Sequence, residues 1–158
     1  MDEKKKREIV LKMLITGDAN FNTIAKSFRD TDMVKAYIDI KRTLKGIPTD
    51  LLTGPIIQYF ASQFGSQKLW ANLPDNFSVY NLPEELKNFD MVQSYVDAKK
   101  TLKGIPDDLL TNQVIKYYAM NFSDSLHFLE GLPESFITPN TLKTFIDKHI
   151  DKKTLFTY

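Results

Sequence analysis

Two stretches of the chain, DMVKAYIDIKRTLKGIPTDLLT (residues 32–53) and DMVQSYVDAKKTLKGIPDDLLT (residues 90–111), are near copies of each other. After a shift of 58 positions they share sixteen residues and differ at six. Self-similarity at a fixed spacing is the sequence signature of repeat proteins, in which one small unit is used more than once. The sequence therefore predicts one structural unit that occurs twice.

Each copy has the pattern of an amphipathic helix with a defined start and end. Asp32 (or Thr31) and Asp90 are placed to cap the helices, and Gly46 and Gly104 are placed for the left-handed residue that ends a helix. Apolar residues recur at helical spacing between these ends. They are Met33, Val34, Tyr37, Ile38 and Leu44 in the first copy and Met91, Val92, Tyr95, Val96 and Leu102 in the second.

A second signature follows the glycines and recurs elsewhere: an aliphatic residue, proline, two mostly polar residues, and Leu or Phe. Proline suits the first position of a short helical turn, and acidic residues favour the positive end of that turn. We expect each such corner to join two helices. The corners are IPTDL (47–51), LPDNF (73–77), LPEEL (82–86), IPDDL (105–109) and LPESF (132–136).

Apolar spacing and caps at Thr53 and Thr111 predict further helices, and no period-two alternation indicates a strand. The additional helices are expected at 3–16, 56–64, 66–72, 114–122, 124–130 and 139–151. The fold class is therefore all-α, with about seven or eight helices in helical-hairpin repeats, stacked as a short α-solenoid or an irregular bundle. We expect a single domain, with a capping half-unit at 1–30, repeats at 31–89 and 90–138, and a capping helix and tail at 139–158.

The composition is that of an ordinary soluble globular chain, with 42% hydrophobic and 26% charged residues. A net charge of +1 gives no overall field toward nucleic acid or an acidic membrane, and the absence of cysteine excludes disulfides and thiolate chemistry. The basic N-terminus leads into an apolar run that Lys12 interrupts, which favours an amphipathic helix over a secretory signal. We expect a cytoplasmic protein with no membrane span.

The sequence offers no constellation of residues for catalysis. The two histidines, His127 and His149, lie in no paired metal-binding spacing, and neither a nucleophile elbow nor a glycine-rich phosphate loop is present. We therefore expect no enzymatic activity, no cofactor and no metal, although an enzyme with an unrecognised site stays a competing class.

Several polar residues match between the copies where packing alone does not obviously require them. Plain duplication explains the matches, and the helix dipole favours cations in the last turn. The alternative is a repeated partner-binding ridge. The candidate residues are Asp39, Lys41 and Lys45 in the first copy and Asp97, Lys99 and Lys103 in the second, with Thr43 and Thr101 also matching. Trp70, the only tryptophan, is either an interface anchor or a core residue under the LPDNF corner.

Another protein is the partner that helical repeats most commonly bind, through the surface that stacking leaves open. Nucleic acid is the alternative, because basic clusters occur at 4–7, 41–45, 99–103 and 148–153. The near-neutral charge and the absence of an RNA-reading signature count against it.

The combination of LKGIPTDLLT, LPEEL and LPESF with an intervening helix resembles an uncharacterised family of short helical repeats. Those repeats occur in secreted effectors of intracellular bacterial pathogens and in some protists. The resemblance covers about residues 40–140 and implies a helical scaffold without known catalytic residues. It suggests an effector or a regulator of effectors, and delivery into a host cell would then need a specialised secretion machine. Separately, so small a module suits inhibition of an enzyme by occupying its surface.

Overall fold

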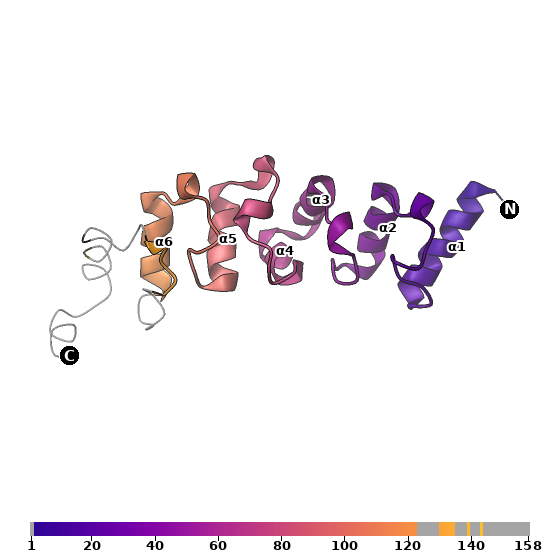
Figure 1. Cartoon of the computed structure of the whole chain (residues 1–158), viewed down its shortest axis with the longest axis horizontal. Helices are drawn as coiled ribbons and strands as arrows, with labels where there is room; N and C mark the ends of the chain where they lie inside the picture. The colour runs from indigo at the N-terminus through magenta and orange to yellow at the C-terminus, as the bar shows by residue number, and fades with distance from the viewer. Residues whose placement is uncertain (1, 123–129, 135–138, 140–142, 144–158) are drawn as a thin grey trace. The chain divides into compact units, whose positions relative to one another are not determined.

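The computed structural model describes residues 2–122, 130–134, 139 and 143, and these contain six α-helices, five 3-10 helices and no strand (Figure 1). The prediction of an all-α chain is confirmed. The described residues hold six α-helices rather than seven or eight, and the helices expected at 124–130 and 139–151 fall almost entirely outside them. None of the described helices is long and apolar enough to cross a membrane.

The chain divides into two compact units, Met1–Asn76 and Phe77–Tyr158. The elements of unit 1 are α1 (Glu3–Thr16), η1 (Lys26–Phe28), α2 (Thr31–Lys41), η2 (Thr49–Leu51), α3 (Gly54–Phe64) and α4 (Ser66–Asn72). Within this unit α1 packs against α2, α2 against α3, and α3 against α4, so that neighbours in sequence are neighbours in space (Figure 1).

Unit 2 repeats the central part of unit 1. Its described elements are η3 (Val79–Asn81), η4 (Glu84–Leu86), α5 (Phe89–Lys99), η5 (Asp107–Leu109) and α6 (Asn112–Phe122), and α5 packs against α6. The shift of 58 carries η1, α2, η2 and α3 onto η4, α5, η5 and α6 with identical boundaries. The repeated phrase is therefore one structural unit used twice, as predicted.

The helix ends differ from the prediction at both termini. Asp30 and Asn88, not Asp32 and Asp90, are the N-cap residues, and their side chains accept hydrogen bonds from the main-chain N–H groups three residues later at 2.9 Å. Asp32 and Asp90 lie in the first turns of their helices instead. The positive end of the helix dipole still stabilises a carboxylate there.

The helices also end earlier than predicted, at Lys41 and Lys99. Arg42 and Lys100 follow in the left-handed region, with φ of 57° and 56°, although neither is glycine. Gly46 and Gly104, expected as the helix ends, have φ of 93° and 96° and lie in the next turn of the chain.

Those two glycines are needed because a tyrosine hydroxyl lies against them. Tyr37 Oη donates to the carbonyl of Lys45 at 3.2 Å, and Tyr95 Oη donates to the carbonyl of Lys103 at 2.6 Å. A Cβ atom added at Gly46 would lie 2.7 Å from Tyr37 Oη. The helix and the turn that follows it are thus joined by one buried tyrosine in each repeat.

Three of the five predicted corners are single turns of 3-10 helix, with proline one position earlier than predicted, and LPESF (132–136) lies partly outside the described residues. Pro48, Pro83 and Pro106 are N-cap residues, with φ near −60° and extended ψ, rather than first helical residues. Proline's fixed φ suits this conformation equally well. Ala25 adopts the same geometry before η1, so a corner without proline escaped the sequence pattern. The LPDNF stretch forms a turn that contains no 3-10 helix.

The core follows the predicted apolar stripes. Every residue named for them is buried in both copies, including Leu44 and Leu102, which lie in the turns rather than in the helices. Burial of each such side chain contributes about 1.5–3 kcal/mol. The periodicity therefore identified the core although the helix ends were misplaced.

Candidate partner-binding surface

The matched aspartates join neighbouring helices. Asp39 on α2 accepts a hydrogen bond from the hydroxyl of Tyr59 on α3, and Asp97 on α5 accepts one from the hydroxyl of Tyr117 on α6. The hydrogen bond to Asp39 raises the pKa of Tyr59, whereas burial and then the bond to Asp97 raise the pKa of Tyr117. These aspartates therefore have a structural reason to match between repeats.

The matched threonines hold the turn after each helix. Thr43 Oγ accepts from the main-chain N–H of Lys45, and Thr101 Oγ accepts from that of Lys103, both at 3.1 Å. The threonine hydroxyls donate in turn to the side-chain oxygen of Asn72 at 2.5 Å and to the main-chain oxygen of Gly131 at 3.2 Å.

Asn72 and Gly131 supply the equivalent hydrogen-bond acceptor in the two repeats. The N–H of Leu44 donates to the Asn72 side chain at 3.2 Å, and the N–H of Leu102 donates to the Gly131 carbonyl at 2.8 Å. The two acceptors are 59 positions apart rather than 58. A main-chain oxygen in one repeat thus takes the place of a side-chain oxygen in the other.

The four matched lysines have different environments. Lys41 Nζ donates to the carbonyl oxygen of Ile15 at the end of α1, at 3.4 Å. The negative end of the helix dipole favours a cation at this place. Lys99 is half-buried. The side chains of Lys45 and Lys103 are exposed. Their main-chain N–H groups donate to a threonine of the same turn, and their C=O groups accept from a tyrosine of the preceding helix.

Trp70 lies inside unit 1. The residue is 2% exposed and belongs to α4, where it follows the fully buried Leu69. A ring at this exposure offers a partner almost no surface. We therefore leave Trp70 out of the proposed contact surface, and its burial favours the packing alternative.

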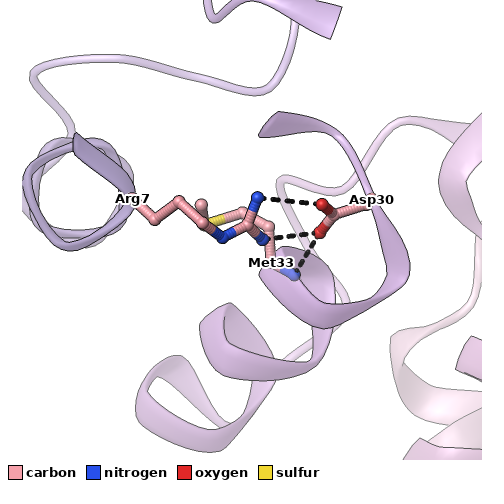
Figure 2. Close-up of polar contacts among 3 residues, drawn as sticks. All are labelled: Arg7, Asp30 and Met33. Carbon is pink, nitrogen blue, oxygen red and sulfur yellow. Dashed lines mark hydrogen bonds and ion pairs between the residues drawn. The ribbon is translucent and has the colours of Figure 1, made fainter. Parts of the chain in front are cut away.

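An ion pair that sequence reasoning missed joins α1 to the start of α2. The Arg7 guanidinium donates to both carboxylate oxygens of Asp30, at 2.9 and 2.7 Å, and the same carboxylate caps α2 through the N–H of Met33 (Figure 2). The hydrogen bond from Arg7 lowers the pKa of Asp30 below its usual value, and the bond from Met33 adds to the effect. No charge spacing along one helix could have revealed this pair, because its members are 23 positions apart.

Replacing Asp30 should separate its two roles. We expect Asp30→Ala to lower the free energy of unfolding by about 1.5 kcal/mol, because it removes both the cap and an ion pair that partial exposure weakens. Asp30→Asn should cost only about 0.5 kcal/mol, since Asn88 is the cap of the second repeat. Chemical denaturation followed by Trp70 fluorescence measures both values.

The pH dependence provides the second measurement on these variants. Because the folded pKa of Asp30 is depressed, its stabilising effect is present above the unfolded pKa of about 3.9 and is lost as pH falls through the folded pKa. The difference between wild type and Asp30→Asn should therefore shrink as the pH falls below the unfolded pKa and disappear once the folded carboxylate is protonated. Asn88→Ala, which removes a cap without an ion pair, should show no such dependence. A difference between wild type and Asp30→Asn that persists at low pH would contradict the ion pair.

No group of three or more histidine or acidic residues that could hold a metal ion occurs within the described ranges. The chain matches no protein-family model, no curated protein and no solved structure. A function is therefore inferred from the two matched repeats and from the side chains that they expose.

Proposed function

We propose that the chain is a non-catalytic helical-repeat module that binds another protein, with its helices stacked as a short α-solenoid. Stacking in chain order supports this arrangement, since each helix of unit 1 packs against the next. Repeat proteins of this kind bury side chains between layers and use the remaining surface for partners. An effector and an inhibitor are two kinds of protein that act in this way. The resemblance of the proline corners to effector repeats supports the first use, and the small size of the module suits the second.

One observation carries the proposal: both repeats hold an exposed lysine on a fixed main chain. The N–H of Lys45 is fixed by Thr43 and its carbonyl by Tyr37, and Lys103 has the corresponding pair of bonds. A fixed main chain lowers the entropy lost when a side chain meets a partner. Lys45 and Lys103 are therefore presented in the same way, which suits a partner with acidic side chains.

The test is a double charge reversal, Lys45→Glu with Lys103→Glu. We expect it to weaken binding of a protein partner, isolated by affinity capture from the source cells, by about tenfold or more, because each reversal replaces attraction by repulsion. Calorimetry measures the binding constants of the wild-type chain and of the double variant for this partner. Lys68→Glu, another exposed lysine on α4, should leave the affinity within about twofold.

Two results would contradict the proposal. Capture of no protein would count against a binding module, and unchanged affinity in the double variant would mean that the lysines match through ancestry alone. Binding of RNA or DNA that weakens steeply with salt would instead favour the nucleic-acid alternative.

A further inference from the structure

A pocket in unit 1 lies between the end of α1, the segment that follows it, and the turn after α2. Its volume is about 260 Å³, and its walls include Phe21, Tyr37 and Gly46. Phe21 and Tyr37 are buried, and their rings meet edge to face with centroids 5.2 Å apart. Sites for drug-sized ligands have volumes of roughly 300–1,000 Å³, so this pocket suits a group the size of one residue.

The second repeat fills the equivalent place with its own main chain. The shift of 58 carries Phe21 onto Val79. It also carries Gly46 onto Gly104, and the Val79 N–H donates to the Gly104 carbonyl at 3.0 Å. A Cβ atom added at Gly104 would lie 3.0 Å from Ser78 Cβ, so the chain before Val79 lies directly on this glycine.

In unit 1 the same two main-chain groups stay apart. Among the described residues, the Phe21 N–H and the Gly46 carbonyl have no hydrogen-bond partner, and a Cβ atom added at Gly46 meets only Tyr37 within 4 Å. The Phe21 ring needs more room on the tyrosine than a valine does, which holds the chain away from the glycine. The pocket therefore offers one main-chain donor and one main-chain acceptor that the second repeat joins to each other.

Lys41 sets the charge of the pocket. Of the described residues that line it, only Lys41 is charged. Its Nζ donates to the carbonyl of Ile15 at 3.4 Å, and an ammonium has three N–H donors, so donors remain for a ligand. The positions three and four residues from Lys41 along the chain hold no acidic residue. Asp18 does not line the pocket, and its carboxylate accepts from the hydroxyl of Thr16 at 3.1 Å. The charge of the pocket therefore favours an anionic ligand.

We propose that this pocket binds the C-terminal residue of the partner protein. The inference rests on the proposed protein-binding function and names the part of the partner that unit 1 holds. A chain end has a main-chain N–H beside a carboxylate. The N–H donates to the Gly46 carbonyl, as the Val79 N–H does to Gly104 in the second repeat. The carboxylate accepts from the Phe21 N–H and from Lys41, and capture of a terminal carboxylate by main-chain groups is a recurring mode of peptide recognition.

The end of α1 favours a chain end over a simple anion. The carbonyl groups of the last helical turn repel an anion, so a carboxylate in this pocket needs the charge of Lys41. An acetate ion has no donor for the Gly46 carbonyl, and a free amino acid brings an ammonium close to Lys41. The amide N–H of a chain end donates without a charge, and a chain end therefore complements all three groups.

The experiment titrates the full chain with short synthetic peptides and follows the amide signals in two-dimensional NMR spectra. The probe is acetyl-Ser-Ser-Ala with a free carboxylate, and its control is the same peptide with a C-terminal amide. We expect the free-acid peptide to shift the signals of Phe21 and Gly46, with an affinity that falls as salt rises. The amidated peptide, sodium acetate and free alanine should each bind at least about tenfold more weakly.

A matched pair of lysine variants locates the carboxylate. Lys41→Gln should weaken the free-acid peptide about tenfold or more, because it removes the charge that faces the carboxylate. Lys99→Gln, at the matched lysine of the second repeat, should leave the affinity unchanged.

A second variant closes the pocket by copying the other repeat. Asn20→Ser with Phe21→Val gives the first repeat the residues of Ser78 and Val79. We expect the N–H at position 21 to reach the Gly46 carbonyl, and the peptide to lose its binding. Circular dichroism of each variant checks that the helix content is unchanged.

Several outcomes would overturn the inference. They are no binding of the free-acid peptide, equal binding of the amidated peptide, acetate or alanine, equal losses in Lys41→Gln and Lys99→Gln, and wild-type affinity in the Lys41→Gln or the pocket-closing variant. A captured partner whose affinity survives removal of its last residue would also overturn it, while leaving the protein-binding function in place. Failure to capture any protein, in contrast, would remove the function itself.

Discussion

Gly104→Ala is expected to lower the free energy of unfolding of unit 2 by about 3 kcal/mol. Two effects add. An L-residue at φ of 96° is strained by about 1–2 kcal/mol. The new Cβ would also overlap the Tyr95 hydroxyl and lie 3.0 Å from Ser78 Cβ, and overpacking of this kind typically costs 1–3 kcal/mol.

Two other glycines separate the strain from the overlap. Gly17 has φ of 84° and nothing within 4 Å of its added Cβ, so Gly17→Ala should cost about 1 kcal/mol from strain alone. Gly46→Ala, with a single contact below 3 Å at Tyr37 Oη, should fall between the two. Denaturation followed by far-UV circular dichroism measures this order, and Trp70 fluorescence reports unit 1 separately.

A double-mutant cycle with Tyr95→Phe tests the cause. Tyr95→Phe alone should cost about 1 kcal/mol, because it removes the bond to the Lys103 carbonyl. Gly104→Ala should then cost less in the Tyr95→Phe background than in wild type, since the hydroxyl that it overlaps is gone. Additive effects, or a cost equal to that of Gly17→Ala, would mean that the hydroxyl does not confine this glycine.

The core could be predicted from the sequence because periodicity survives errors at helix ends. Leu44 was assigned to a helix and lies in a turn, yet it is buried at 2% exposure. The exact helix ends could not be predicted from the sequence. Three successive residues, Asp30, Thr31 and Asp32, are all good caps, and propensity alone does not choose among them. Nor does any pattern predict that Arg42 adopts a left-handed conformation while a glycine follows four residues later.

The roles of the matched polar residues required the packing of one helix on another. Asp39 and Tyr59 are 20 positions apart, and their hydrogen bond exists because α2 packs on α3. Both members recur 58 positions later as Asp97 and Tyr117, which was a signal that they act as a pair. Asn72 gave no such signal, because its counterpart Gly131 contributes a main-chain oxygen.

Trp70→Ala is expected to lower the free energy of unfolding by about 4 kcal/mol, since it empties a large volume in the core. The residue is 2% exposed beside Leu69, which is fully buried. Trp70→Phe should cost about half as much, because part of the volume is kept. Ile40→Ala, at a side chain that is 55% exposed in the same unit, should stay within about 0.5 kcal/mol.

Because the only tryptophan is removed, far-UV circular dichroism rather than fluorescence follows this unfolding. The same variants decide between the two roles considered for Trp70. If Trp70 is a core residue, Trp70→Ala is unstable, and the folded Trp70→Phe variant keeps its affinity for a partner. A stable Trp70→Ala variant that has lost its partner would instead identify the ring as an interface anchor, and it would contradict the packing of α4 described above.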